Sequence, residues 1–168
     1  MITPELKHKL KQIFPTNLHQ LRDLPGGGIY AFITWQNVRE RLDEICDWEI
    51  EYCDPILIDD LCIIRCTLTI QGTKRQGVGN ASVIKTKIGN FAEAAIADSF
   101  KNAAEQFGLG AYLDDPEMQR QLKGDRVLVD EYQKRTGKAI GIYAKNAASS
   151  ANSTSPTAQA PRKSLINR

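Results

Sequence analysis

The side chains best suited to chemistry are cations gathered into two segments of a nearly neutral chain. Its formal net charge is +2, with 22 Lys and Arg against 20 Asp and Glu. Residues 61–92 include no acid and five bases, which are Arg65, Lys74, Arg75, Lys85 and Lys87. Residues 132–168 hold seven bases and no acid. Such stripes suit a phosphate backbone, from which fixed cations displace counterions, or they could simply solvate a sheet face.

An acidic segment precedes the first basic one. Nine acids and a single base, Arg41, stand between Glu40 and Asp60. This segment could be a solvated surface, or it could meet the basic segment of a neighbouring subunit. The second possibility predicts a head-to-tail homo-oligomer.

No combination of side chains predicts a catalytic or metal site. A metal-dependent nuclease would need a carboxylate dyad, and the adjacent pairs available are Asp59-Asp60 and Asp114-Asp115. Neighbouring residues on a strand point to opposite faces, so neither pair makes a dyad there. The four cysteines lack the CxxC spacing of a zinc site. We therefore expect reduced, buried cysteines, no metal, no cofactor and no enzymatic activity.

The strands that must position the cations indicate an α+β fold. Apolar and polar residues alternate over residues 61–70, which predicts a strand with one buried face and Arg65 on the other. Comparable patterns predict strands over residues 48–53 and about 73–84. Gly77 in the third strand, like the glycine two positions on, predicts a bulge or the close approach of another backbone. The expected result is a small antiparallel sheet.

Cap residues predict where the helices begin. Thr3 and Thr34 start two amphipathic helices, separated by an expected loop over residues 16–28. Asn90 starts an alanine-rich third helix, and a weaker helix is expected over residues 115–136. The helices should pack against one face of the sheet.

Composition predicts two regions. Residues 1–146 are expected to form one domain, large enough to bury a core. Residues 147–168 are rich in Ser, Ala, Thr, Asn and Pro without an apolar period, which predicts a disordered basic tail. No apolar run approaches the roughly 20 residues that span a bilayer, so we expect no membrane association and a cytoplasmic location.

The stretch ADSFKNAAEQFGLGAYL, from Ala97 to Leu113, carries the most specific pattern in the chain. It closely resembles the signature helix of the Rad52 family of single-strand annealing and recombination-mediator proteins, which includes DdrA-like bacterial members. Upstream, VRERLD followed by Trp48 resembles the family's helix and tryptophan-bearing strand, and the glycine-containing third strand follows in order. The resemblance covers roughly residues 30–115, about half of the chain.

The resemblance implies a β-β-β-α core and assembly into a closed ring. Single-stranded DNA would lie in a basic groove with its bases turned outward, and no nucleotide cofactor or metal would be needed. The implied function is single-stranded DNA binding and annealing of complementary strands in homologous recombination and DNA repair. A nucleoid-associated homo-oligomer is expected, with a recombinase or another repair protein as a further candidate partner.

Lys101 stands where the family's signature helix carries a DNA-contacting lysine. The next position, usually basic, is Asn102, whose amide can still donate to a phosphate. One turn on, Glu105 replaces a common arginine, and Asn37 stands where the family often places a base. The residues expected to contact DNA are Lys101, Asn102, Arg65, Lys74, Arg75, Lys85 and Lys87.

Tyrosines add a possible stacking surface for bases. Tyr30, Tyr52 and Tyr112 could each stack on a base. Tyr52 shares a strand face with Trp48 and Ile50, so it is expected in the core instead.

Two other functions stay open at this point. A DdrA-like protein could protect DNA ends without annealing strands, and the missing positive charge at Asn102 and Glu105 favours this. A double-stranded RNA-binding module also has an α+β core with three strands and a flanking helix. It would be a monomer that prefers duplex RNA, whereas the GLGAYL end of the third helix favours the annealing family.

Overall fold

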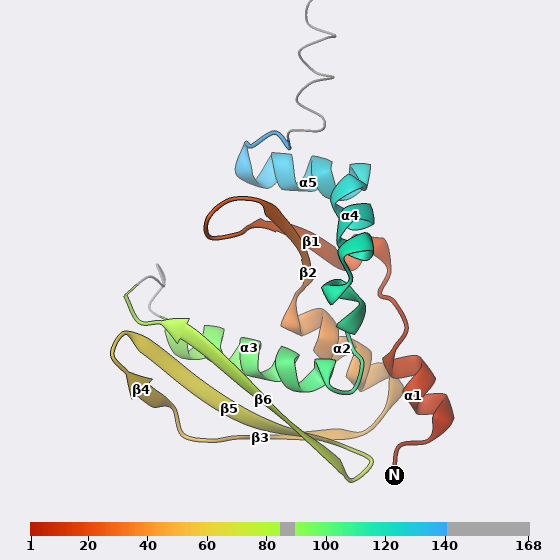
Figure 1. The fold of residues 1–168 in the computed structure, drawn as a ribbon. Coiled ribbons are helices and arrows are strands. Elements are labelled where there is room, and N and C mark those ends of the chain that lie inside the picture. Colours follow the sequence, from red (N-terminus) through yellow and green to blue (C-terminus); the bar gives the residue numbers. More distant parts are fainter. Residues whose placement is uncertain (85–89, 141–168) are drawn as a thin grey trace, which may run out of the picture.

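The computed structural model describes residues 1–84 and 90–140 of the chain. It confirms the α+β class: a four-stranded sheet lies on one side of α3 (Phe91–Glu105), and a separate β-hairpin lies on the other (Figure 1). Lys85, Lys87 and the tail predicted for residues 147–168 fall outside the described residues. Those assignments, and the division into two regions, stay predictions.

The larger sheet is built around one long strand. β5 (Leu61–Ile70) pairs antiparallel with β6 (Thr73–Ser82) along one side, and with β3 (Trp48–Tyr52) and β4 (Ile56–Ile58) along the other. The β5 side chains alternate as predicted, and the buried ones are Cys62, Ile64, Cys66, Leu68 and Ile70. The β-β-β-α core is therefore confirmed. β4 was not predicted, because three apolar residues in a row carry no period of two.

The backbone of α3 packs directly against β6. An ideal Cβ on Gly77 would lie 2.0 Å from the carbonyl oxygen of Ser99, and one on Gly79 would lie 2.1 Å from that of Ala95. No side chain fits into this space, which confirms the predicted close approach of another backbone. The helix contributes small residues to the contact, with Ala95, Ser99 and Ala103 all fully buried.

Polar side chains of α3 also seal the outer edge of β6, which pairs only with β5 among the described strands. The side-chain amide of Asn102 donates to the carbonyl of Val78 at 2.7 Å, and that of Gln106 donates to the carbonyl of Gln76 at 2.5 Å. One turn earlier, the carboxylate of Asp98 accepts the next outward amide of β6 at 3.3 Å. The strand edge is thus satisfied without another strand.

The expectation of a loop over residues 16–28 was wrong. Thr16–Leu18 form a 3-10 turn (η1), and β1 (His19–Asp23) pairs antiparallel with β2 (Ile29–Ile33). Leu21 is the only aliphatic residue of β1, so the alternation that signals a strand is nearly absent. The three consecutive glycines that follow Pro25 form the hairpin turn, with φ between 90° and 99°.

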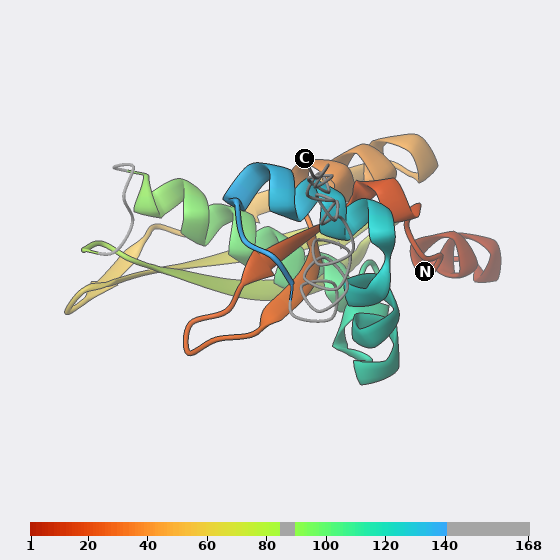
Figure 2. The ribbon, with the colours of Figure 1, turned by 90° about the horizontal axis from the view of Figure 1, so that it is seen from above.

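Two helices hold the hairpin on the face away from α3. Figure 2 shows α5 (Arg126–Thr136) lying across the base of the hairpin, with α4 (Pro116–Gly124) beside it. The buried Gln119 of α4 exchanges two hydrogen bonds of 2.9 Å with the backbone of Ala31 on β2. On the other edge, the Arg135 guanidinium donates to the carbonyl of Leu21.

A single helix over residues 115–136 was predicted, and the structure divides it. Asp125 has an extended backbone, with φ −70° and ψ 125°, and its carboxylate accepts from the amides of Val127 and Leu128. It therefore ends α4 and begins α5. The apolar residues of both helices pack with the hairpin in a small core, which includes Leu21, Ala31, Leu122, Leu128, Val129 and Tyr132.

The main core lies between the sheet and the remaining helices. α1 (Pro4–Leu10) and α2 (Trp35–Ile45) begin at the predicted threonine caps, whose hydroxyls accept backbone amides three residues on. Leu10, Leu42 and Phe100 are nearly inaccessible within this core. Tyr52 was expected there, but it is 44% exposed, because it is the last residue of β3, an edge strand of the sheet.

Replacing Gly79 with alanine should destabilise the fold by about 3 kcal/mol, near the upper end of overpacking costs, because helix and strand backbones must separate. Equilibrium unfolding in denaturant measures the change. Gly124→Ala is the matched control, since an added Cβ there meets nothing within 4 Å and alanine favours a helix. Equal stability of the two variants would contradict the contact between α3 and β6.

Candidate nucleic-acid interface

A groove runs between the β-hairpin and α3. Two hollows, of about 220 and 360 Å³, adjoin there and share the lining residues Arg22, Phe32, Ile33, Asp98 and Lys101. Their walls come from β1, β2, the first turn of α2, α3 and η2 (Ala111–Asp114). We call this the hairpin groove. It brings side chains from distant parts of the sequence onto one surface.

Arg22 places a cation on the hairpin side of the groove. Its guanidinium lies 5.2 Å from the ring centre of Phe32 and 5.9 Å from that of Tyr30, its register partner on β2. A planar guanidinium held against aromatic rings can bind phosphate oxygens and stack on bases. The sequence patterns did not indicate Arg22 and Phe32, because they predicted no strand in the hairpin. The available signal was the mixture of aromatic and aliphatic residues directly after the three glycines.

Lys101 places the second cation on the α3 side. Burial lowers the pKa of its ammonium group, and the nearby charge of Arg22 acts in the same direction. Asp98 and Glu105 partly offset this by favouring the charged form. Lys101 and Arg22 repel each other in a partly desolvated groove. A bound anion would compensate the cost of desolvating the two cations and would weaken their repulsion.

Two carboxyl groups lie at the other end of the groove. Burial, a hydrogen bond to the Asp114 carboxyl and the charge of Asp114 together raise the pKa of Glu105 to about 7, and Lys101 offsets part of this. Both carboxyl groups line the smaller hollow beside Tyr30. The groove therefore carries mixed charge: Asp98 lies beside Arg22 and Lys101 in both hollows, and Glu105 and Asp114 line the smaller hollow alone.

Asn102, an expected contact residue, and Asn37, which stands where the family often places a base, both use their side-chain amides within the fold. Asn102 lines the smaller hollow, but its amide nitrogen donates to the β6 edge at Val78. The amide of Asn37 donates to the carbonyl of Leu18 at 3.0 Å, which fixes the chain before β1. Both residues hold backbone that shapes the groove.

The other described candidates lie outside the groove. Arg65 and Lys74 are exposed on the sheet face away from α3, which the acidic residues of β3 share. Arg75 lies on the α3 side of the sheet, where its guanidinium is 5.9 Å from the ring centre of Phe107. The five described candidates thus divide between surfaces, and only Lys101 and Asn102 reach the groove.

The tyrosines divide in a similar way. Tyr30 faces the groove, with its hydroxyl donating to the carbonyl of Leu113 at 3.2 Å. The hydroxyl of Tyr112 instead accepts the amide of Phe14 at 3.2 Å and lies 2.7 Å from Nε2 of the buried His19. Tyr112 is therefore an internal hydrogen-bonding residue, and Tyr30 is the tyrosine available to a ligand in the groove.

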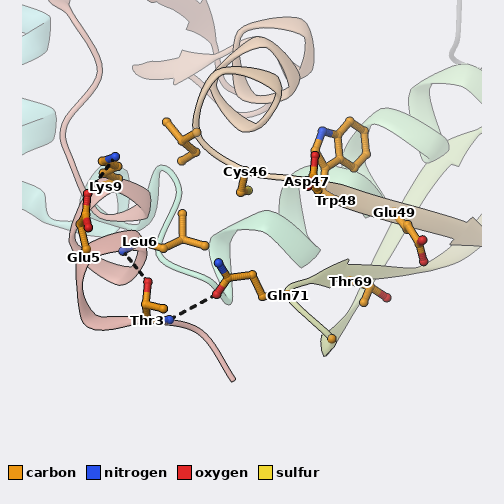
Figure 3. Close-up of a pocket in the computed structure, with 12 residues that line it drawn as sticks. Thr3, Glu5, Leu6, Lys9, Cys46, Asp47, Trp48, Glu49, Thr69 and Gln71 are labelled. Carbon is orange, nitrogen blue, oxygen red and sulfur yellow. Dashed lines mark hydrogen bonds and ion pairs between the residues drawn. The ribbon is translucent and has the colours of Figure 1, made fainter.

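A larger hollow, of about 690 Å³, lies between α1, the start of β3 and the β5–β6 turn (Figure 3). Its lining includes the carboxylates of Glu5, Asp47 and Glu49, and its one cation, Lys9, is 3.2 Å from Glu5 in an ion pair. Such a surface repels phosphates. The hairpin groove, although smaller, is the better candidate for a polyanion.

The sequence profile of the Rad52/22 family of double-strand break repair proteins matches residues 3–128 of the 168. The chain belongs to this family. The match extends the resemblance of the signature helix to the hairpin, both groove walls and α4.

Curated relatives include single-stranded DNA-binding protein DdrA from Deinococcus deserti, which is 34% identical over 87 residues, or 51% of this chain and 41% of the relative. The protein of the same name from Deinococcus radiodurans is 32% identical over 91 residues, or 52% of this chain and 41% of the relative. The chain thus matches about two fifths of the length of these relatives.

Two other kinds of site do not occur in the described part of the chain. Over residues 1–84 and 90–140, no three His, Cys, Asp or Glu side chains are placed to hold a metal ion together. Over the same ranges, no helix has the length and apolar character needed to cross a membrane.

Glu105→Gln should flatten the pH dependence of stability between pH 5 and 8. The pKa of Glu105 is about 7 in the folded state, against 4.5 for an ordinary glutamate. Its favourable contribution to the free energy of unfolding is therefore complete below pH 4.5 and is lost as the pH rises to 7. The wild-type melting temperature should therefore fall relative to that of the variant over this range. Thermal unfolding at a series of pH values measures both melting temperatures. If they changed with pH in the same way in the two proteins, the burial and pairing of this carboxyl group would be contradicted.

Proposed function

We propose that this Rad52/22-family chain binds single-stranded DNA in the hairpin groove during recombinational repair. The observation that carries the proposal is the convergence of Arg22 and Lys101 on one groove, beside the rings of Tyr30 and Phe32. The two cations attract phosphates, and the rings can stack on bases that a single strand leaves accessible. The DdrA relatives are named as single-stranded DNA-binding proteins, which supports the same ligand.

We further propose that the chain works as a homo-oligomeric ring that anneals complementary strands. Its β4 edge supports association, because Ile56, Leu57 and Ile58 are 54%, 64% and 52% exposed. Consecutive exposed aliphatic residues on a sheet edge are typical of a surface that another chain covers. Several grooves side by side would hold one strand extended, with its bases available for pairing. A recombinase or other repair protein is a further proposed partner.

Lys101→Gln and Arg22→Gln should each weaken single-stranded DNA binding about tenfold, because each removes a cation that neutralises a phosphate. The log–log salt dependence should become shallower by about 0.7 for each cation removed. Fluorescence anisotropy with a labelled oligonucleotide measures both quantities. Lys7→Gln is the control, since it removes one exposed charge from α1, away from the groove. An equal drop in affinity for all three variants would show that net charge alone governs binding.

The outer sheet face is a separate proposed contact. Arg65 and Lys74 lie there, and Arg75 lies near the same turn. Lys85 and Lys87 are also proposed to contact DNA, on the basis of the sequence alone. If this face binds DNA weakly, Arg65→Gln should lower affinity less than Lys101→Gln does.

Annealing and end protection are separated by mixing two complementary labelled strands with the protein and following energy transfer. An annealing protein should accelerate pairing, and added salt should reduce the acceleration because phosphate contacts weaken. Binding without acceleration would favour end protection. The observation that supports end protection is the presence of the Glu105 and Asp114 carboxyl groups in the groove. Preferential binding of duplex RNA in a parallel titration would overturn both.

A further inference from the structure

Resting on the proposed DNA-binding function, we infer that the carboxyl pair of Glu105 and Asp114 couples DNA binding in the hairpin groove to proton uptake. The groove binds a single strand more strongly when the pair carries one proton, and more weakly once that proton leaves. The pair thus acts as a proton-dependent gate at one end of the groove.

The placement of the pair is the first argument. Glu105 follows Lys101 by one turn on α3, and Asp114 reaches the same hollow from η2. The hollow is continuous with the cationic end of the groove through Arg22, Asp98 and Lys101, which line both parts. A strand that contacts the two cations therefore passes close to the carboxyl pair.

Charge balance is the second argument. The ionisable groups facing the pair are Asp98 and Lys101 from α3, Arg22 from β1 and Tyr30 from β2. With Glu105 and Asp114 both ionised, three carboxylates face two cations, and an incoming phosphate is repelled. One proton on the pair leaves two carboxylates against two cations, and the repulsion falls.

The shared surroundings of the two carboxyl groups are the third argument. Glu105 and Asp114 line the same hollow, and two neighbouring carboxyl groups resist being ionised together. Burial and the neighbouring Asp114 carboxyl raise the pKa of Glu105 to about 7, so the proton is exchanged near neutral pH. A bound phosphate adds negative charge beside the pair and raises its pKa further. If bound DNA increases the proton affinity of the pair, then by thermodynamic linkage protonation of the pair must increase the affinity for DNA by the same factor.

The test measures the affinity for a labelled single strand from pH 6 to 8.5 at constant ionic strength. We expect wild-type affinity to fall above pH 7 by up to about tenfold per pH unit, the limit for one proton. Glu105→Gln and Asp114→Asn should each keep high affinity with a much flatter profile. Glu131→Gln, which removes an exposed carboxylate from α5, should retain the wild-type profile. This comparison separates the pair from the histidines and the terminal amine, which are present in every variant.

A second readout follows the pair itself. Carbon-13 chemical shifts of the Glu105 carboxyl should titrate near pH 7 in the free protein and at higher pH in the complex. Binding that is equally tight and flat with pH in wild type and both variants would overturn the gate while leaving the proposed function intact. No single-strand binding at any pH, with the carboxyl still titrating near 7, would overturn the proposed function and the gate with it.

Discussion

The structure depends on the contact between the backbones of α3 and β6. A Cβ added at Gly77 or Gly79 would clash with the carbonyl oxygen of Ser99 or Ala95. The two backbones are therefore so close that α3 cannot rotate about its axis. Since each helical residue turns the chain by about 100°, seating Ala95 and Ser99 on the strand fixes every other side chain of α3. Lys101 must then face the hairpin, which is why a packing contact on one side of the helix determines the chemistry on the other.

Sealed strand edges are the second constraint on the groove. α3 covers the edge of β6 with side-chain hydrogen bonds, and Gln119 and Arg135 do the same for β2 and β1. Backbone groups that lack a strand partner must be satisfied in this way or by water. The polar residues near the groove therefore have two roles. Some, such as Asn102, hold an edge, while Arg22 and Lys101 point into the groove and can meet a ligand.

Sequence patterns predicted the parts of the fold where one local signal dominates. Period-two alternation defined β5, cap residues located the first three helices, and the glycines of β6 indicated a backbone contact. The hairpin escaped prediction because α5 packs on β1 and α4 packs on β2, and both helices are distant in sequence, whereas β1 has almost no alternation of its own. The site was predicted only in part for the same reason. Lys101 could be placed on its helix from the sequence, whereas Arg22 reaches the groove only because the hairpin folds over α3.

The charge pattern of the groove bears on why this chain would need to associate. Each chain presents two cations in the hairpin groove, Arg22 and Lys101, and places carboxyl groups beside them. Two phosphate contacts give weak binding at physiological salt. When grooves are linked in one assembly, each further contact becomes intramolecular, and modest sites combine into strong overall binding. In an assembly of the proposed kind, a small change in the affinity of one groove, such as that from a proton on its carboxyl pair, would be multiplied by the number of grooves holding the strand.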